Sequence, residues 1–248
     1  MTTVLKLGGS VITDKETPET VDDGTLAAIG AEIGAALRDG TVSRLVVVHG
    51  GGSFGHHHAQ RHGVSATEGT RDARAVAAIH GAMTDLNDAV LECLHGEGVD
   101  ALPVRPLSVA RREEGLELPT GTVEAMLAEG FLPVLHGDTV VETGVGARIL
   151  SGDEIVVSLA RSLDADRVGL CSSVPGVLDE SGAVVPRVET FDEVADALGS
   201  GEGADVTGGM AGKVRALLEL STPASVFGPG DLGRFLAGER PGTVVQSR

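Results

Sequence analysis

The sequence feature that most limits the possible folds is the alternation of short, wholly apolar runs with longer segments of helical periodicity. The run at 44–48 (Arg-Leu-Val-Val-Val) shows no apolar–polar alternation, which is typical of a parallel strand covered on both faces. The segment before it, 24–38, places Leu26, Ile29 and Ile33 at helical spacing. This order recurs along the chain and predicts an α/β layered fold with a mostly parallel sheet.

The same criteria give the expected elements of the whole chain. We predict strands at 3–7, 44–48, 100–104, 132–135, 167–171, 224–227 and 243–246. We predict helices at 24–38, 70–96, 121–129, 152–163, 191–198 and 212–221. The Gly-rich, acidic stretch 199–209 is expected to be a mobile loop. No repeat or low-complexity linker divides the chain, so we expect a single domain over residues 1–248.

The charge of the chain excludes several classes of partner. A formal net charge of −17 disfavours a nucleic-acid or anionic-membrane binder, because both need a basic surface. No apolar segment reaches the about 18 residues needed to span a bilayer, and no signal peptide is visible at the N-terminus. Two cysteines, Cys93 and Cys171, fit a reduced compartment. We therefore expect a cytoplasmic protein.

Lysine is rare in this chain, and its three positions are informative. Lys6, Lys15 and Lys213 each lie in or beside a Gly-rich or strand-to-loop segment, whereas the remaining basic residues are arginines. A compact ammonium group acts as a point charge on a phosphate, which the planar guanidinium of arginine does not reproduce. Unless their placement is a coincidence, the three lysines indicate phosphate chemistry.

Three Gly-rich turns support the same interpretation. They lie at 8–10, 50–55 and 208–212, and each follows an apolar strand or opens a helix. Glycine lets backbone N–H groups approach a ligand, and a helix N-terminus favours anions. Together with the lysines, the turns predict a polyphosphate ligand. No Walker A motif is present, and although 50–55 formally fits Gly-x-Gly-x-x-Gly, no acidic residue ends the following strand as a dinucleotide site requires.

The histidines after the second turn do not form a convincing metal motif. Adjacent side chains at His56, His57 and His58 point in different directions, and neither cysteine nor paired carboxylates complete a ligand set with His62. We expect His57 and His58 to lie in a solvated loop. His56 ends the Gly-rich turn, where its ring N–H could meet an anion.

Two aspartates follow glycine at the end of a strand or the start of a helix. Asp138 and Asp153 could form an acid–base pair, but Asp153 is better explained as an anionic group that organises two lysines. No Ser-His-Asp hydrolase signature occurs, since Gly50-Gly51-Gly52-Ser53 is not Gly-x-Ser-x-Gly.

Four strings of residues resemble one known family. Lys6-Leu7-Gly8-Gly9-Ser10-Val11-Ile12-Thr13, the segment 49–56, Ser151-Gly152-Asp153 and the segment 205–213 are similar to the amino acid kinase superfamily and, within it, to the isopentenyl phosphate kinases. The strings follow the family's order and span nearly the whole chain. The most specific part is Gly-Ser-Phe-Gly-His at 52–56.

The resemblance implies a fold and a reaction. The fold would be a three-layer αβα sandwich with an open, mostly parallel sheet. An acceptor-binding lobe would cover about residues 1–165 and a nucleotide-binding lobe about 166–248. The protein would be a homodimer that uses ATP, with Mg²⁺ held mainly through the phosphates and no dedicated metal ligands. It would phosphorylate isopentenyl phosphate to isopentenyl diphosphate in isoprenoid biosynthesis.

The resemblance also assigns roles by position. The catalytic residues would be Lys6, Lys15, Asp153 and Lys213, with Asp153 orienting Lys6 and Lys213. Acceptor-phosphate binding would fall to Gly51, His56 and Gly152. The nucleotide and its transferred phosphate would be bound by Lys6, Gly8, Gly9, Ser10, Gly52, Ser173, Gly208, Gly209 and Lys213.

An isoprenoid tail also requires an apolar wall beside the phosphate site. The predicted helix 70–96 follows the His56 turn closely, and Val76, Ile79, Met83 and Leu86 recur on one of its faces. We expect Val76, Ile79 and Met83 to set the depth of the acceptor pocket, unless this face is ordinary core.

One segment departs from the family pattern. Relatives carry Thr-Asp-Val-Asp-Gly-Val where this chain has Ser172-Ser173-Val174-Pro175-Gly176-Val177, so both acidic positions are replaced. The nucleotide contacts there are therefore open. Another kinase of the superfamily, such as a fosfomycin-type or an acyl-phosphate-forming kinase, and a non-catalytic nucleotide-binding regulator remain alternatives.

The acidic, lysine-poor composition generates the first testable prediction. Thirty-six acidic groups against 19 basic ones repel each other in the folded state, and salt screens that repulsion. The melting temperature should therefore rise by more than about 4 °C between low and molar KCl. A melting temperature that is independent of KCl would show that the composition is no adaptation to high salt.

Overall fold

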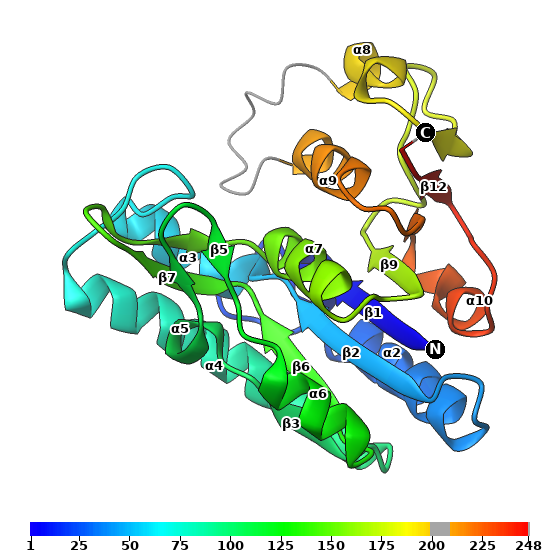
Figure 1. Cartoon of the computed structure of the whole chain (residues 1–248), viewed down its shortest axis with the longest axis horizontal. Coiled ribbons are helices and arrows are strands. Elements are labelled where there is room, and N and C mark those ends of the chain that lie inside the picture. The colour runs from blue at the N-terminus through cyan, green and yellow to red at the C-terminus, as the bar shows by residue number, and fades with distance from the viewer. Residues whose placement is uncertain (199–208, 248) are drawn as a thin grey trace.

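The computed structural model of the chain describes residues 1–198 and 209–247, and its centre is an eight-stranded sheet (Figure 1). The strand order is β10-β12-β11-β9-β1-β2-β6-β3, and every neighbouring pair is parallel except β11–β12. The strands are β1 Thr2–Leu7, β2 Arg44–His49, β3 Ala101–Pro103, β6 Leu132–His136, β9 Arg167–Cys171, β10 Arg187–Val188, β11 Ala224–Phe227 and β12 Thr243–Val245. The mostly parallel sheet predicted from the apolar runs is confirmed.

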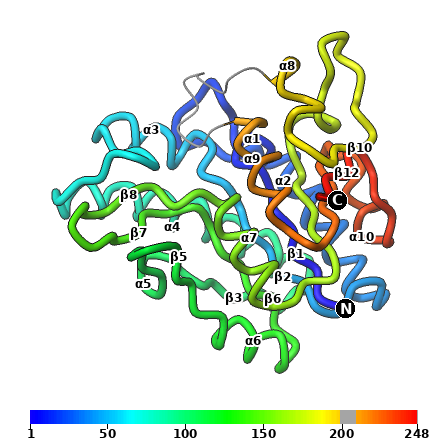
Figure 2. The backbone as a smooth tube through the Cα atoms, turned by 45° about the horizontal axis from the view of Figure 1, so that its top comes forward, coloured from blue at the N-terminus to red at the C-terminus, as the bar shows by residue number. Residues whose placement is uncertain are grey.

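Helices cover both faces of this sheet because its strands are apolar on both sides. Successive residues of a strand point to opposite faces, so Val4 packs into one core cluster and Leu5 into the other. One face carries α1 Gly9–Ile12, α2 Asp23–Arg38, α4 Ala73–Gly96 and α10 Leu232–Leu236. The other carries α6 Gly121–Ala128, α7 Gly152–Ser162 and α9 Gly209–Leu218. The result is the expected three-layer αβα sandwich. The tube in Figure 2 shows β7 and β8 at one end of the molecule and β12 and α10 at the other.

A second, four-stranded sheet was not predicted. It contains β4 Arg111–Arg112, β5 Leu116–Glu117, β7 Asp138–Glu142 and β8 Gly146–Leu150, in the order β5-β4-β7-β8, with α5 Pro106–Val109 beside it. Two of its strands are two residues long, and β7 and β8 form a hairpin with little apolar periodicity. Arg112 joins this sheet to the sandwich by donating from Nη2 to Glu154 Oε1 of α7 at 2.5 Å.

The predicted loop at His57 and His58 is wrong, because both residues lie on α3, Gly52–His62. This helix was not predicted because glycine, which stands at its start, and histidine both have weak helix propensity. The sequence nevertheless contains a typical signal for the end of a helix, because Gly63 caps α3 in the left-handed conformation at φ 64°.

Two smaller differences concern the C-terminal third. The predicted helix 191–198 is a 3₁₀ turn, Phe191–Glu193, followed by the short α8, Ala195–Leu198. The predicted helix 212–221 begins earlier, at Gly209, and ends at Leu218. Of the expected loop 199–209, residues 199–208 lie outside the described residues.

Within the described ranges, no helix is long and apolar enough to cross a membrane.

Two glycine turns touch each other because they follow adjacent parallel strands. β1 and β2 pair in register from Thr2–Arg44 to Leu7–His49, so the turns that follow them emerge side by side. A Cβ atom on Gly9 would lie 2.1 Å from the backbone nitrogen of Gly52. Only glycine fits there, because the neighbouring atoms belong to the backbone and cannot rotate away.

We predict that Gly9→Ala forces the two turns apart and lowers the melting temperature by about 4 °C or more. The matched control is Gly81→Ala in the middle of α4, where an added Cβ would meet nothing within 4 Å. That substitution should raise the melting temperature by about 1–3 °C, because it removes the backbone entropy of a helical glycine. Thermal unfolding of both variants checks the prediction, and an unchanged Gly9→Ala protein would contradict it.

Candidate active site

A cavity of about 710 Å³ lies at the carboxyl ends of the central strands, where the glycine turns meet the N-termini of α3, α7 and α9. Ligands of open α/β sheets bind at this edge. The cavity brings together most of the residues predicted from the sequence: Lys6, Gly8, Gly9, Ser10, Lys15, Gly51, Gly52, His56, Ile79, Met83, Gly152, Asp153, Ser173, Gly209 and Lys213. Val76 is partly buried on α4 and does not line it, and Gly208 lies outside the described residues.

A buried ion pair forms the floor of the cavity. The Nζ atom of Lys6, near the end of β1, lies 2.7 Å from Oδ1 of Asp153, and both side chains are less than 10% exposed. Asp153 stands in the first turn of α7, where a negative charge is favoured by the helix dipole. A reciprocal capping box between Ser151 and Glu154 sets the start of that helix. Gly152 leaves room for the lysine, since a Cβ there would lie 3.1 Å from Lys6 Cε.

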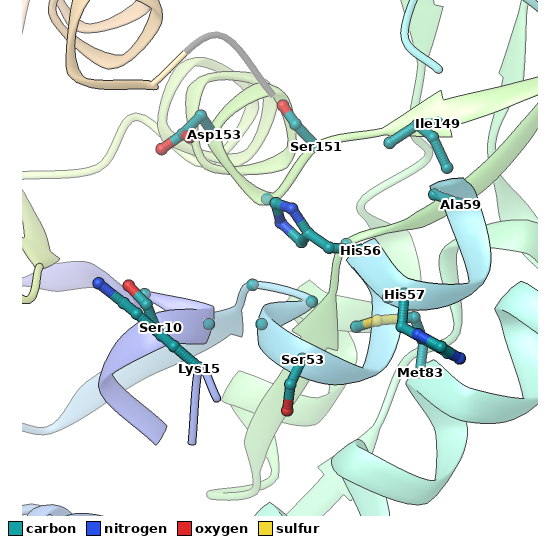
Figure 3. Close-up of a pocket in the computed structure, with 18 of the residues that line it drawn as sticks. Ser10, Lys15, Ser53, His56, His57, Ala59, Met83, Ile149, Ser151 and Asp153 are labelled. Atoms are coloured by element: carbon teal, nitrogen blue, oxygen red, sulfur yellow. The ribbon is translucent and has the colours of Figure 1, made fainter. Parts of the chain in front are cut away.

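The other two lysines reach the cavity from separate elements. Lys213, on α9, donates from Nζ to the carbonyl oxygen of Gly209 at 3.3 Å. Lys15 is exposed in the segment after α1 and points towards the same space as Ser10 (Figure 3). Orientation of Lys213 by Asp153 stays a prediction, because the hydrogen bond seen for Lys213 among the described residues goes to the Gly209 carbonyl.

Three helix N-termini add partial positive charge. Gly51 and Gly52 begin α3, Ser151 and Gly152 begin α7, and Gly209 begins α9; all five residues line the cavity. The first N–H groups of a helix have no intrahelical acceptor and attract anions. Three ammonium groups and three helix starts around one space make it suitable for several phosphate groups.

The histidines of α3 face different ways, as their adjacency predicts. Figure 3 shows the His56 ring directed towards Ser151 and Asp153, whereas the His57 ring, which also borders the cavity, points away from His56. His58 lies partly buried, with Nε2 2.6 Å from Glu19 Oε1. In the part of the chain that the structure describes, no three His, Cys, Asp or Glu side chains gather as a metal site.

One side of the cavity is apolar. Ile79 and Met83 of α4 contribute to it, together with Ala59 of α3 and Ile149 of β8, which the sequence did not indicate. Ala59, Val64, Ile79 and Ile149 form one buried cluster. The two additional residues were missed because α3 and β8 were themselves missed. Met83 also packs against the turn, since a Cβ on Gly55 would lie 2.8 Å from its Sδ.

The segment that departs from the family pattern also borders the cavity. Ser172, Ser173 and Val174 line it, and the hydroxyl of Ser10 donates to Oγ of Ser173 at 3.4 Å. This wall is therefore polar and uncharged, and it is linked directly to the glycine turn after β1.

Comparisons with known proteins agree with this geometry. The chain is 60% identical to isopentenyl phosphate kinase of Haloferax volcanii over 98% of both chains. It is 31% identical to isopentenyl phosphate kinase of Methanocaldococcus jannaschii over 99% of this chain and 98% of the relative. A crystal structure of an isopentenyl phosphate kinase superposes with a TM-score of 0.85 over 98% of this chain and 99% of that one, at 28% identity. A model of the amino acid kinase family matches residues 1–224, and the chain belongs to that family.

Proposed function

We propose that this kinase transfers the γ-phosphoryl group of ATP to isopentenyl phosphate, giving isopentenyl diphosphate for isoprenoid biosynthesis. The observation that carries the proposal is the composition of one cavity. Its cationic and N–H-rich part suits phosphates, and the apolar surface of Met83 and Ile149 adjoins it beside His56 (Figure 3). Ile79 lines the same cavity. The relatives at 60% and 31% identity carry the same activity in their names.

The residues support transfer by positioning and charge neutralisation. Phosphoryl transfer spreads negative charge over the transferred group and needs little covalent chemistry from the protein. Lys6 and Lys213 would neutralise that charge on the nucleotide side, and Lys15 would do so from the exposed rim. The N–H groups of Gly9 and Ser10 would hold the transferred phosphate, while Asp153 keeps Lys6 in place at 2.7 Å. Gly8 borders the same space, but its N–H donates to the carbonyl oxygen of Cys171 at 2.8 Å.

The acceptor would bind on the α3 and α4 side. Its phosphate would lie against Gly51, Gly152 and the His56 ring, which can donate a charge-assisted hydrogen bond. Its five-carbon tail would then extend along Ile79 and Met83. This arrangement would direct the acceptor's phosphate oxygen towards the glycine turn that would hold the γ-phosphate, as in-line transfer requires.

The nucleotide would bind on the α9 side, with contacts from Gly52, Ser173, Gly209 and Lys213, and with Gly208 as a predicted contact. Mg²⁺ fits as an ion carried by the phosphates, because Asp153, the carboxylate on the floor of the cavity, is already paired with Lys6. When bound, it would neutralise charge on the ATP oxygens. We also propose that the chain has two lobes, at about 1–165 and 166–248, and that it forms a homodimer. We further propose a cytoplasmic location and adaptation to high salt.

An acceptor panel tests the proposed function. ATP consumption with isopentenyl phosphate should exceed that with fosfomycin, glutamate or UMP under the same conditions. His56→Ala and His56→Gln should lower kcat/KM for isopentenyl phosphate by about 10-fold or more, since each loses a charge-assisted hydrogen bond to phosphate. Preference for fosfomycin would identify a different kinase of the family, and no turnover with any acceptor would favour a regulator.

Substitutions of Lys6 and Lys213 test the effect of each lysine on turnover separately from its effect on stability. Lys6→Ala and Lys213→Ala should each lower kcat by about 10²-fold or more, and arginine should rescue poorly because its planar group is larger. Lys213→Ala should leave the melting temperature nearly unchanged, because Lys213 is only partly buried. Lys6→Ala should also destabilise the fold by about 3 kcal/mol or more, because Asp153 stays buried without this partner. Near-normal turnover of the arginine variants would contradict the assignment.

The apolar wall predicts chain-length selectivity. Ile79→Ala and Met83→Ala should each raise kcat/KM for geranyl phosphate relative to isopentenyl phosphate by about 10-fold, because they deepen the pocket. Leu86→Ala is the matched control: Leu86 is buried on the same helix but does not line the cavity. All three variants should lose stability, by about 2–5 kcal/mol. An unchanged chain-length ratio in the first two would show that Ile79 and Met83 are only core.

A further inference from the structure

Two histidines outside the predicted site lie directly beneath the cavity. His49 ends β2 and His136 ends β6, and the two are register partners in the sheet. Both are fully buried, and their ring centroids lie 5.5 Å apart. Each is followed by a glycine that lines the cavity, Gly50 or Gly137. Completely buried histidines at this edge require an explanation, because burial of a titratable group is costly.

The hydrogen bonds determine which nitrogen carries the proton. His49 Nδ1 lies 3.1 Å from the carbonyl oxygen of Gly50, and His136 Nδ1 lies 2.9 Å from that of Gly137. Since a carbonyl only accepts, each Nδ1 must donate. His49 Nε2 lies 3.1 Å from Asn87 Nδ2 of α4, which is a donor, so this nitrogen must accept. With the Asn87 amide oriented as in the structure, the contacts give a neutral His49 ring with its proton on Nδ1.

Burial keeps both rings neutral. Desolvation lowers the pKa of His49 to about 3, and the neighbouring His136 lowers it further. Desolvation also lowers the pKa of His136. The charged or titratable groups near His136 are Asp138, whose Oδ2 lies 3.9 Å from its Nδ1, and His80, which pairs with Asp138 at 2.9 Å, together with Arg105. Asp138 and the Gly137 carbonyl oppose the downward shift, and burial outweighs both.

The consequence concerns the peptide bond between Gly50 and Gly51. In a trans peptide the C=O and N–H groups point in opposite directions. The His49 ring lies in the core and holds the Gly50 carbonyl on the core side. The N–H of Gly51 is thereby turned to the other side, where Gly51 borders the cavity as the N-cap of α3. Without a side chain, a glycine pair could otherwise flip this peptide at little cost.

We propose that His49 is a positioning residue for acceptor binding: its Nδ1–H, aligned by Asn87, holds the Gly50–Gly51 peptide with its N–H directed at the acceptor's phosphate. His136 holds the neighbouring Gly137 turn in the same way. The proposal rests on the proposed function only in taking the anion to be the acceptor's phosphate. The three-residue chain Asn87–His49–Gly50 also connects α4, which forms the tail wall, to the phosphate turn.

The tautomer can be measured directly on the wild-type enzyme without any substrate. Long-range ¹H–¹⁵N spectra at pH 7 should show His49 and His136 neutral and protonated on Nδ1, with resonances assigned through His49→Asn and His136→Asn. A His49 ring protonated on Nε2, or on both nitrogens, would overturn the proposal. This measurement is independent of whether the glutamine and leucine variants of His49 fold.

Three substitutions of His49 test the role itself. Asparagine places an N–H donor near the position of Nδ1, glutamine places its donor near that of Nε2, and leucine has none. His49→Asn should keep the KM for isopentenyl phosphate within about 3-fold of wild type. His49→Gln and His49→Leu should raise it by about 10-fold or more, as expected for a displaced hydrogen bond to a charged group, with the KM for ATP nearly unchanged.

His95→Leu is the matched control. His95 lies near the end of α4 and donates from Nε2 to the Ala101 carbonyl at 2.9 Å, remote from the lining of the cavity. Its loss should lower the melting temperature without changing the KM for isopentenyl phosphate. Equal KM values in His49→Asn and His49→Leu would overturn the positioning role. Inactivity of the wild-type enzyme with isopentenyl phosphate would instead overturn the proposed function, so the two failures are distinguishable.

Discussion

The buried ion pair between Lys6 and Asp153 is the interaction on which the arrangement of the site depends. It joins the end of the central strand β1 to the first turn of α7, two elements 147 residues apart in the sequence. Both partners are shielded from water, so removal of either would leave a charge in the interior at a cost of about 3–5 kcal/mol. The pair therefore fixes a lysine ammonium group where the glycine turns and helix starts converge.

The surroundings of this pair follow from the parallel sheet. Because β1, β2 and β6 are parallel neighbours, their carboxyl ends and the turns that follow them lie at one edge. The contact between Gly9 and Gly52 brings two of these turns together, and neutral His49 and His136 sit beneath two of them as register partners. Backbone N–H groups and buried side chains thus make a polar floor, whereas α3, α4 and β8 add the apolar side. A phosphate with a short hydrocarbon tail matches both parts.

Much of this could be predicted from the sequence, and the reasons for the failures are physical. Apolar runs such as 44–48 were recognisable because a strand buried on both faces must be apolar throughout. Lys6, Lys15 and Lys213 stood out because lysine is otherwise absent from the chain. Helix α3 was missed because glycines and histidines are weak helix formers, and its stability comes from packing of Phe54 and Ala59 against other elements. The four-stranded sheet was missed because its short strands are specified by their partners.

The sequence by itself determined the order of most strands of the central sheet and of the longer helices that cover it. It also determined the glycine turns after β1 and β2 and the chemical character of a phosphate site, because each of these depends on local composition and spacing. Only the tertiary structure decided which side chains meet. It paired Lys6 with Asp153, brought Ile149 of β8 to Ile79 of α4, and left Val76 outside the cavity. It also buried His49 and His136 side by side beneath the turns. These contacts join residues far apart in the chain, so their geometry is set by how the layers pack and not by any local pattern.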